Sequence, residues 1–108
     1  MEEVIALEER RRNIDRIDKT IVALLAERMR QGLAAGDLKR QQRRPARSPD
    51  REAEVLARVR GAAADPLTAS SAERIFALII EETSALQARV TEKPSALQEA
   101  AGDEDFAG

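Results

Sequence analysis

The sequence predicts an all-α protein with three helices per subunit. Apolar residues recur at the 3/4 spacing of a helix face, no stretch alternates as a strand would, and charged residues make up 35% of the chain. This mixture is typical of long amphipathic helices. A length of 108 residues predicts one domain. We place it at residues 1–91 and expect a disordered acidic tail at residues 92–108.

The first helix is predicted to be very long, because residues 7–42 contain no Pro. Its apolar face carries Ile14, Ile17, Ile21, Leu24 and Leu25. Such a helix would extend on the order of 50 Å, more than a compact chain of this size covers. We therefore expect a second subunit against it. A break at Gly32 and Gly36 is the competing interpretation, since glycine weakens a helix.

Two shorter helices follow a polar loop. Ser48 is expected to cap the second helix, with Pro49 at its first position and an end near Ala64. After a turn, Thr68 is expected to cap the third helix, which should end near Val90. The three elements together predict a simple helical subunit.

The composition excludes most catalytic chemistries. The chain has no Cys and no His, so it can form no disulfide, no zinc finger, no imidazole base and no Cys–His or Ser–His nucleophile pair. We expect no metal and no cofactor. No apolar run approaches the length of a membrane span, which predicts a cytoplasmic protein without a membrane partner. A net charge of −2 gives no general attraction to nucleic acid.

Polar side chains occupy positions where the helical pattern predicts apolar ones. In the first helix, Arg28 and Lys39 are eleven positions apart and fall within about 20° of each other around the axis. Core-facing charges are costly unless paired, so either structural salt bridges, outward snorkelling or an anionic ligand must account for them. The other helices add four polar residues at comparable positions: Arg51, Glu52, Thr83 and Gln87.

These residues resemble the all-helical chorismate mutases of the AroQ class, also called type II. The resemblance covers residues 7–89 and rests on five pieces in the right order: 11–18, 24–28, Lys39, 47–52, and 76–81 with Thr83 and Gln87. It implies an intertwined homodimer in which each active site takes one arginine from the partner's long helix. Arg11 matches that arginine. It lies 17 residues from Arg28, about 25 Å along one helix, too far to hold the same small ligand in cis.

The resemblance implies an isomerase that converts chorismate to prephenate by a [3,3] rearrangement. This reaction needs no nucleophile, so catalysis consists of holding the reactive conformer and stabilising the charge that develops. By position, Arg28 and the partner's Arg11 would bind the two substrate carboxylates. Lys39 and Gln87 would donate to the ether oxygen.

Further roles follow from the same resemblance. Glu52 and the backbone N–H of Ser48 would hold the 4-substituent of the ring, Arg51 would orient Glu52, and Thr83 would contact a carboxylate. Three more residues are expected against the ring: Ala35, Ile80 and Ser84. Ala35 and Ser84 depart from the bulkier or more apolar residues that the family usually has there.

Because of these two departures, more than one substrate is compatible with the sequence. The leading alternative to chorismate is 4-amino-4-deoxychorismate, whose ring amine would pair with Glu52 and whose product feeds p-aminophenylalanine-type antibiotic precursors. An isochorismate-pyruvate lyase shares the fold, but Glu52 after Arg51 favours a mutase. A non-enzymatic helical binding module is suggested by the basic runs 10–12 and 40–47. A regulatory domain that needs an activating partner enzyme is a further alternative.

Overall fold

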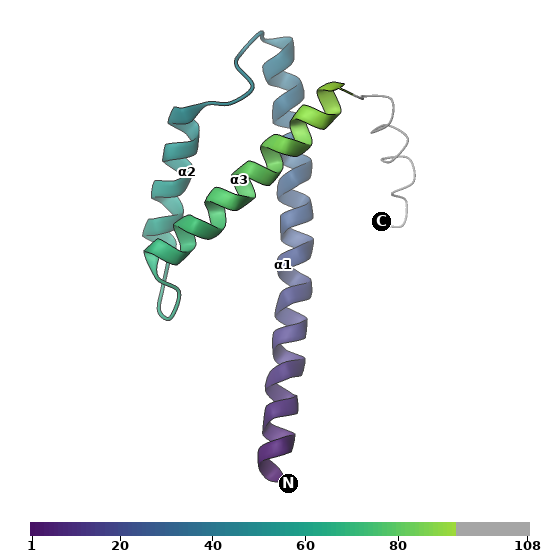
Figure 1. Ribbon diagram of the computed structural model, residues 1–108, viewed down its shortest axis with the longest axis vertical. Helices are drawn as coiled ribbons and strands as arrows, with labels where there is room; N and C mark the ends of the chain where they lie inside the picture. Colours follow the sequence, from purple (N-terminus) through teal and green to yellow (C-terminus); the bar gives the residue numbers. More distant parts are fainter. Residues whose placement is uncertain (93–108) are drawn as a thin grey trace. The chain divides into compact units, whose positions relative to one another are not determined.

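The computed structural model describes residues 1–92, and these are helical except for two connecting segments and the first residue (Figure 1). The helices are α1 (Glu2–Gln41), α2 (Pro49–Ala62) and α3 (Ala69–Glu92). The predicted all-α class with a very long first helix is confirmed, and residues 1–92 contain no strand. Apart from Glu92, which ends α3, the predicted disordered tail lies outside the described residues.

α1 is longer than expected at its N-terminus and continuous through its glycines. It begins at Glu2, where Glu2 and Glu3 place negative charge in the first turn, a favourable position for the helix dipole. The competing interpretation of a break at Gly32 and Gly36 is wrong, because α1 passes through both. Two glycines in a helix this long cost little compared with the hydrogen bonds on either side.

The C-terminus of α1 is closed by a Schellman motif. The N–H of Arg44 donates to the carbonyl of Lys39 at 2.8 Å, and the N–H of Arg43 donates to the carbonyl of Arg40 at 3.1 Å. Arg43 has a φ of 56°, in the left-handed region. This pattern of hydrogen bonds requires one left-handed residue just after the helix. It ends α1 and reverses the chain toward the segment that precedes α2.

The predicted caps of α2 and α3 are confirmed. The Oγ of Ser48 accepts a hydrogen bond from the N–H of Arg51 at 3.2 Å, and Pro49 is the first helical residue. The Oγ1 of Thr68 accepts from the N–H of Ser71 at 3.1 Å. α2 ends at Ala62, two residues before the predicted end, because Ala63 already has extended backbone angles.

The chain divides into two compact units, Met1–Gly32 and the part that begins at Leu33. In the second unit, α2 packs against α3 (Figure 1), with Val55 and Ala72 buried. An ion pair between Arg60 of α2 and Glu73 of α3, at 2.9 Å, supports this packing. The second unit also contains the last turns of α1 and carries the candidate site.

The first unit leaves its apolar face uncovered. The predicted apolar stripe has side chains that are 48–63% exposed: Ile14, Ile17, Ile21 and Leu24. A row of large apolar side chains at this spacing is normally buried against another helix. None of the helices in residues 1–92 combines the length and the apolarity that a bilayer span requires.

Candidate active site

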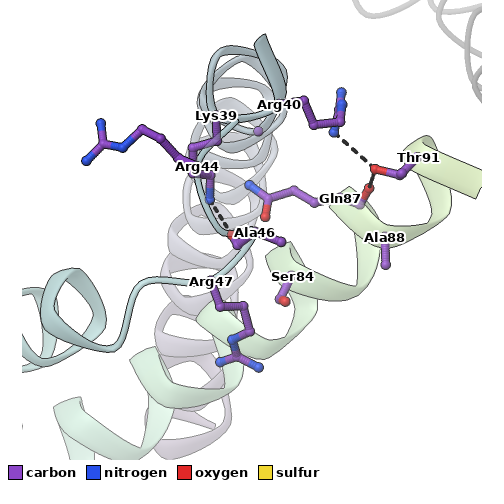
Figure 2. A pocket seen from close by; sticks show the side chains of 10 residues that line it. Lys39, Arg40, Arg44, Ala46, Arg47, Ser84, Gln87, Ala88 and Thr91 are labelled. Atoms are coloured by element: carbon purple, nitrogen blue, oxygen red, sulfur yellow. Dashed lines mark hydrogen bonds between the residues drawn. The ribbon is translucent and has the colours of Figure 1, made fainter. Parts of the chain in front are cut away.

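A pocket of about 340 Å³ opens in the second unit, between the end of α1, the following loop and the C-terminal half of α3 (Figure 2). Its volume lies in the range of small-molecule sites. The lining is rich in cations and hydrogen-bonding groups, and consists of Gly36, Lys39, Arg40, Arg44, Ala46, Arg47, Ser84, Gln87, Ala88 and Thr91. Four cationic side chains in one pocket favour a small anionic ligand.

Lys39 is half-buried at the last turn of α1. Its Nζ donates to the backbone carbonyl of Ala46 at 2.6 Å, as the dashed line in Figure 2 shows. The chain reversal after α1 brings this carbonyl back to the helix that it has just left. Because an ammonium has three N–H donors, the bond to Ala46 fixes the side chain and leaves two donors for a ligand.

Gln87 lies on α3 close to Gly36, the buried residue of α1. A Cβ added to Gly36 would lie 3.3 Å from the Cγ of Gln87 and 3.4 Å from its Nε2. In Figure 2 the Gln87 side chain extends from α3 toward the end of α1 and the Ala46 segment. The glycine thus lets the amide approach the helix closely, on the side of the pocket where Lys39 lies.

Arg47 joins α2 to α3 at the edge of this pocket. Its Nε and Nη2 donate to the two carboxylate oxygens of Glu52 at 2.9 and 2.8 Å. Its Nη1 and Nη2 donate to Glu81 of α3 at 3.2 and 2.9 Å. The guanidinium therefore makes a bidentate contact with Glu52, the strongest geometry of an arginine–carboxylate pair.

These contacts fix the charge state of the cluster. Hydrogen bonds from Arg47 are the main cause of a lowered pKa at Glu52, and the positive charges of Arg47 and Lys39 lower it further, against an opposing effect of burial. The two carboxylates, Glu52 first, raise the pKa of Arg47 above its already high ordinary value. At neutral pH, Glu52 is a carboxylate and Arg47 a cation.

Arg51 and Glu52, expected from the sequence to pair with each other, have other partners in the structure. The guanidinium of Arg51 binds Glu54 instead, and Glu52 is held by Arg47. Neighbouring residues on a helix point about 100° apart and cannot face each other, whereas residues three apart can. Ser48, expected to offer its backbone N–H to the substrate, lies directly after Arg47 and caps α2.

Thr83 and Ser84 take different positions on α3. Thr83 is buried, with 8% of its surface exposed, and its Oγ1 donates to the carbonyl of Ile79 at 2.8 Å. Ser84 lines the pocket, and Thr83 is not among the lining residues. The hydroxyl of Thr83 would have to turn away from its own helix to donate to a ligand, while Ser84 already faces the pocket.

The remaining expected residues lie outside the pocket lining. Ala35 is exposed and Ile80 is half-buried, both in the second unit. Arg28 is half-buried in the first unit. Arg11, also in the first unit, has a side chain that is 61% exposed and pairs with Glu8 at 2.9 Å.

Some pocket residues were not among those expected from the sequence. Arg40 donates from its Nη1 to the Oγ1 of Thr91 at 3.1 Å and also pairs with Asp37. Thr91 extends the row of Thr83 and Gln87 by one more step of four, a spacing that could have indicated it. The position of Arg47 in the loop gave no periodic signal, although it precedes the cap residue Ser48 directly.

A comparison of the sequence with models of protein families assigns the chain to a family. The family model described as chorismate mutase type II matches residues 10–88. The chain belongs to the type II chorismate mutase family. As a member of this family it is an isomerase of the chorismate mutase type. The comparisons with curated proteins and with solved structures gave no match.

The pocket of this chorismate mutase family member suits an isomerase that binds a small anion. Within residues 1–92, no three Asp or Glu side chains gather closely enough to hold a metal ion. What the pocket offers is fixed positive charge and N–H donors from Lys39 and Gln87, with Glu52 held as a carboxylate nearby through Arg47. These groups can bind an anion, orient it and stabilise charge, and none of them is a strong nucleophile at neutral pH.

Proposed function

We propose that this protein converts chorismate to prephenate by an intramolecular [3,3] rearrangement. One C–O bond breaks and one C–C bond forms within a single molecule, so no atom or electron enters or leaves. The observation that carries the proposal is Lys39, a half-buried ammonium fixed by Ala46 in a pocket that also contains Gln87. In a type II chorismate mutase these are the donors to the ether oxygen.

Stabilising charge at that oxygen is the main catalytic contribution in this proposal. Negative charge grows on the ether oxygen as the C–O bond lengthens. The two remaining N–H donors of Lys39 and the amide of Gln87 would meet this charge. Lys39 is held in place by Ala46 before the substrate arrives. Donors that need no rearrangement during the reaction stabilise a transition state most effectively.

Binding the reactive conformer is the second contribution. Chorismate carries two carboxylates, and we assign them to Arg28 and to Arg11 of a second copy of the chain. The exposed apolar stripe of α1 supports a homodimer, because four large side chains of that helix are about half exposed or more in the single chain. The substrate would then be clamped at both ends, which is how a unimolecular reaction gains from positioning. Thr83 would add a contact to a carboxylate.

Glu52 and the N–H of Ser48 are assigned to the 4-substituent of the ring. A carboxylate offers about four lone-pair positions, so the contact of Glu52 with Arg47 leaves capacity for a hydroxyl donor. Ala35, Ile80 and Ser84 are assigned to the ring itself. Arg51 would contribute to binding through the first turn of α2 and not through Glu52, which Arg47 holds.

A second candidate substrate is 4-amino-4-deoxychorismate. Ser84 favours it, because a hydroxyl lines the pocket where an apolar residue is usual in the family. The carboxylate of Glu52, with its lowered pKa, is also a suitable partner for a ring ammonium. The rearrangement and the roles of Lys39 and Gln87 would be the same for both substrates.

The test compares the purified protein on chorismate, on its 4-amino analogue and on isochorismate, with the product identified in each case. We expect prephenate from chorismate at a kcat/KM at least tenfold above that for the analogue. A preference for the amino compound would replace the first proposal by the second. Pyruvate release from isochorismate alone would indicate a lyase, and no turnover of any of the three would reject the enzymatic assignment.

A further inference from the structure

The loop segment Ala46–Arg47 contacts two of the proposed catalytic groups at once. The carbonyl of Ala46 accepts the hydrogen bond that fixes Lys39. The guanidinium of the next residue, Arg47, holds Glu52 through two hydrogen bonds. Lys39 lies in the last turn of α1 and Glu52 in the first turn of α2, so this segment connects side chains from two different helices.

The segment is itself anchored at a third point. Arg47 also donates two hydrogen bonds to Glu81 of α3, at 3.2 and 2.9 Å. A guanidinium that binds two carboxylates is confined to one plane and one orientation. These bonds tie residue 47 to both α2 and α3, and the carbonyl of Ala46 belongs to the peptide bond directly before Arg47.

We propose that Arg47 is a positioning residue that sets the placement of both Lys39 and Glu52 through its bridge between α2 and α3. The inference rests on the proposed function for its effect on turnover, but its effect on Glu52 is a property of the free protein. Arg47 holds Glu52 directly, and it holds Lys39 through the carbonyl of Ala46.

An arginine with a purely structural role would join the helices without contacting Glu52. Arg60 of α2 and Glu73 of α3 form an ion pair directly between the two helices, at 2.9 Å and with side chains 47% and 42% exposed. The pair of Arg47 with Glu81 has similar dimensions, at 2.9 Å and with 41% and 62% exposure. Both pairs support the packing of α2 on α3, but only Arg47 contacts Glu52. Arg60→Gln is therefore a matched control for Arg47→Gln.

The first measurement follows the side-chain carboxyl of Glu52 by carbon NMR as a function of pH in the free protein. The charged groups that act on Glu52 are Arg47 from the loop and Lys39 from α1, and Glu81 of α3 shares Arg47. Without Arg47, burial opposes ionisation and only Lys39 supports it. We expect the pKa of Glu52 to rise in Arg47→Gln and to stay at its wild-type value in Arg60→Gln.

The second measurement is the pH profile of kcat/KM. In the proposed function Glu52 acts as a carboxylate, so a raised pKa of Glu52 moves the acid limb of the profile to higher pH. In Arg47→Gln we expect this shift together with a roughly 100-fold loss of kcat/KM, the cost of misplacing groups by about 1 Å. Arg47→Lys keeps the charge but loses the bidentate hydrogen bonds, which are the main cause of the lowered pKa of Glu52. This variant should therefore keep only part of that lowering and still lose most of the rate.

The outcomes separate the two proposals. If the wild-type protein turns over none of the substrates while Arg47→Gln still raises the pKa of Glu52, the proposed function fails and the direct hold on Glu52 stands. If the wild-type protein is active and Arg47→Gln changes neither the pKa nor the profile, the positioning role is rejected. Equal losses of kcat/KM in Arg47→Gln and Arg60→Gln, with an unmoved profile, would reduce Arg47 to a structural residue.

Discussion

Lys39 illustrates how much of the proposed catalysis depends on a single side chain. Its ammonium is half-buried and fixed by one hydrogen bond of 2.6 Å to Ala46. Removing it takes away a donor that meets developing charge, and such losses cost about 100- to 1,000-fold in kcat. We expect Lys39→Ala to lose at least 100-fold in kcat for chorismate and to keep its circular dichroism spectrum and thermal midpoint.

The matched control for that variant is Lys19→Ala, which removes an exposed lysine from the same helix. Its kcat should equal that of the wild-type protein. If Lys39→Ala retained turnover within a factor of a few, the assignment of Lys39 to the ether oxygen would be wrong.

Gly36 offers a test of how tightly Gln87 is placed. A Cβ at this position would lie 3.3 Å from the Cγ of Gln87, so Gln87 would have to shift by a few tenths of an ångström. We expect Gly36→Ala to lower kcat about tenfold, because the amide leaves its position beside Lys39. Steady-state kinetics measure this effect.

Gly61→Ala is the control for the change in helix propensity. A Cβ at Gly61 would meet nothing within 4 Å. This variant should therefore gain up to about 1 kcal/mol in unfolding free energy and keep the wild-type kcat. A Gly36→Ala variant that kept full turnover as well would show that the close approach to Gln87 has no catalytic role.

The sequence could indicate Glu52 as a site residue but could not indicate its partner. Glu52 could be recognised because it lies on the apolar stripe of its helix. Its partner could not, since Arg47 belongs to a loop without periodicity and meets Glu81 only after α2 and α3 have packed. The adjacent Arg51 was the plausible partner by sequence, and helix geometry directs it to Glu54 instead.

At the scale of elements, the helix starts were predictable and one helix end was not. Ser48 and Thr68 cap their helices through short-range hydrogen bonds that depend on residue type alone. The end of α1 depends on a left-handed residue, and the sequence places Arg43 there in place of the usual glycine. Residue type therefore gave no signal for the Schellman motif.

This motif leads to a stability prediction. A non-glycine residue in the left-handed region costs about 1 kcal/mol or more, and glycine avoids that cost. We expect Arg43→Gly to raise the unfolding free energy by up to about 1 kcal/mol, measured by urea denaturation. A lowered value would contradict the role of Arg43 as the left-handed residue of the motif.

For the whole molecule, the proposed active site requires a second copy of the chain. The apolar stripe of α1 was predicted from periodicity alone, and the structure shows these side chains 48–63% exposed. Arg11 and Arg28 lie 17 residues apart on that helix, about 25 Å along its axis. One small dicarboxylate can meet both only if Arg11 comes from the other subunit.

Subunit complementation tests whether Lys39 of one chain and Arg11 of another form one active site. Arg11→Ala and Lys39→Ala are purified separately, shown to be nearly inactive, then unfolded together in equal amounts, refolded and assayed with chorismate. If each site combines Lys39 of one chain with Arg11 of its partner, random pairing restores one intact site in every mixed dimer, about a quarter of all sites. We predict recovery of about a quarter of wild-type activity. A mixture no more active than its two components would contradict an active site assembled from two chains.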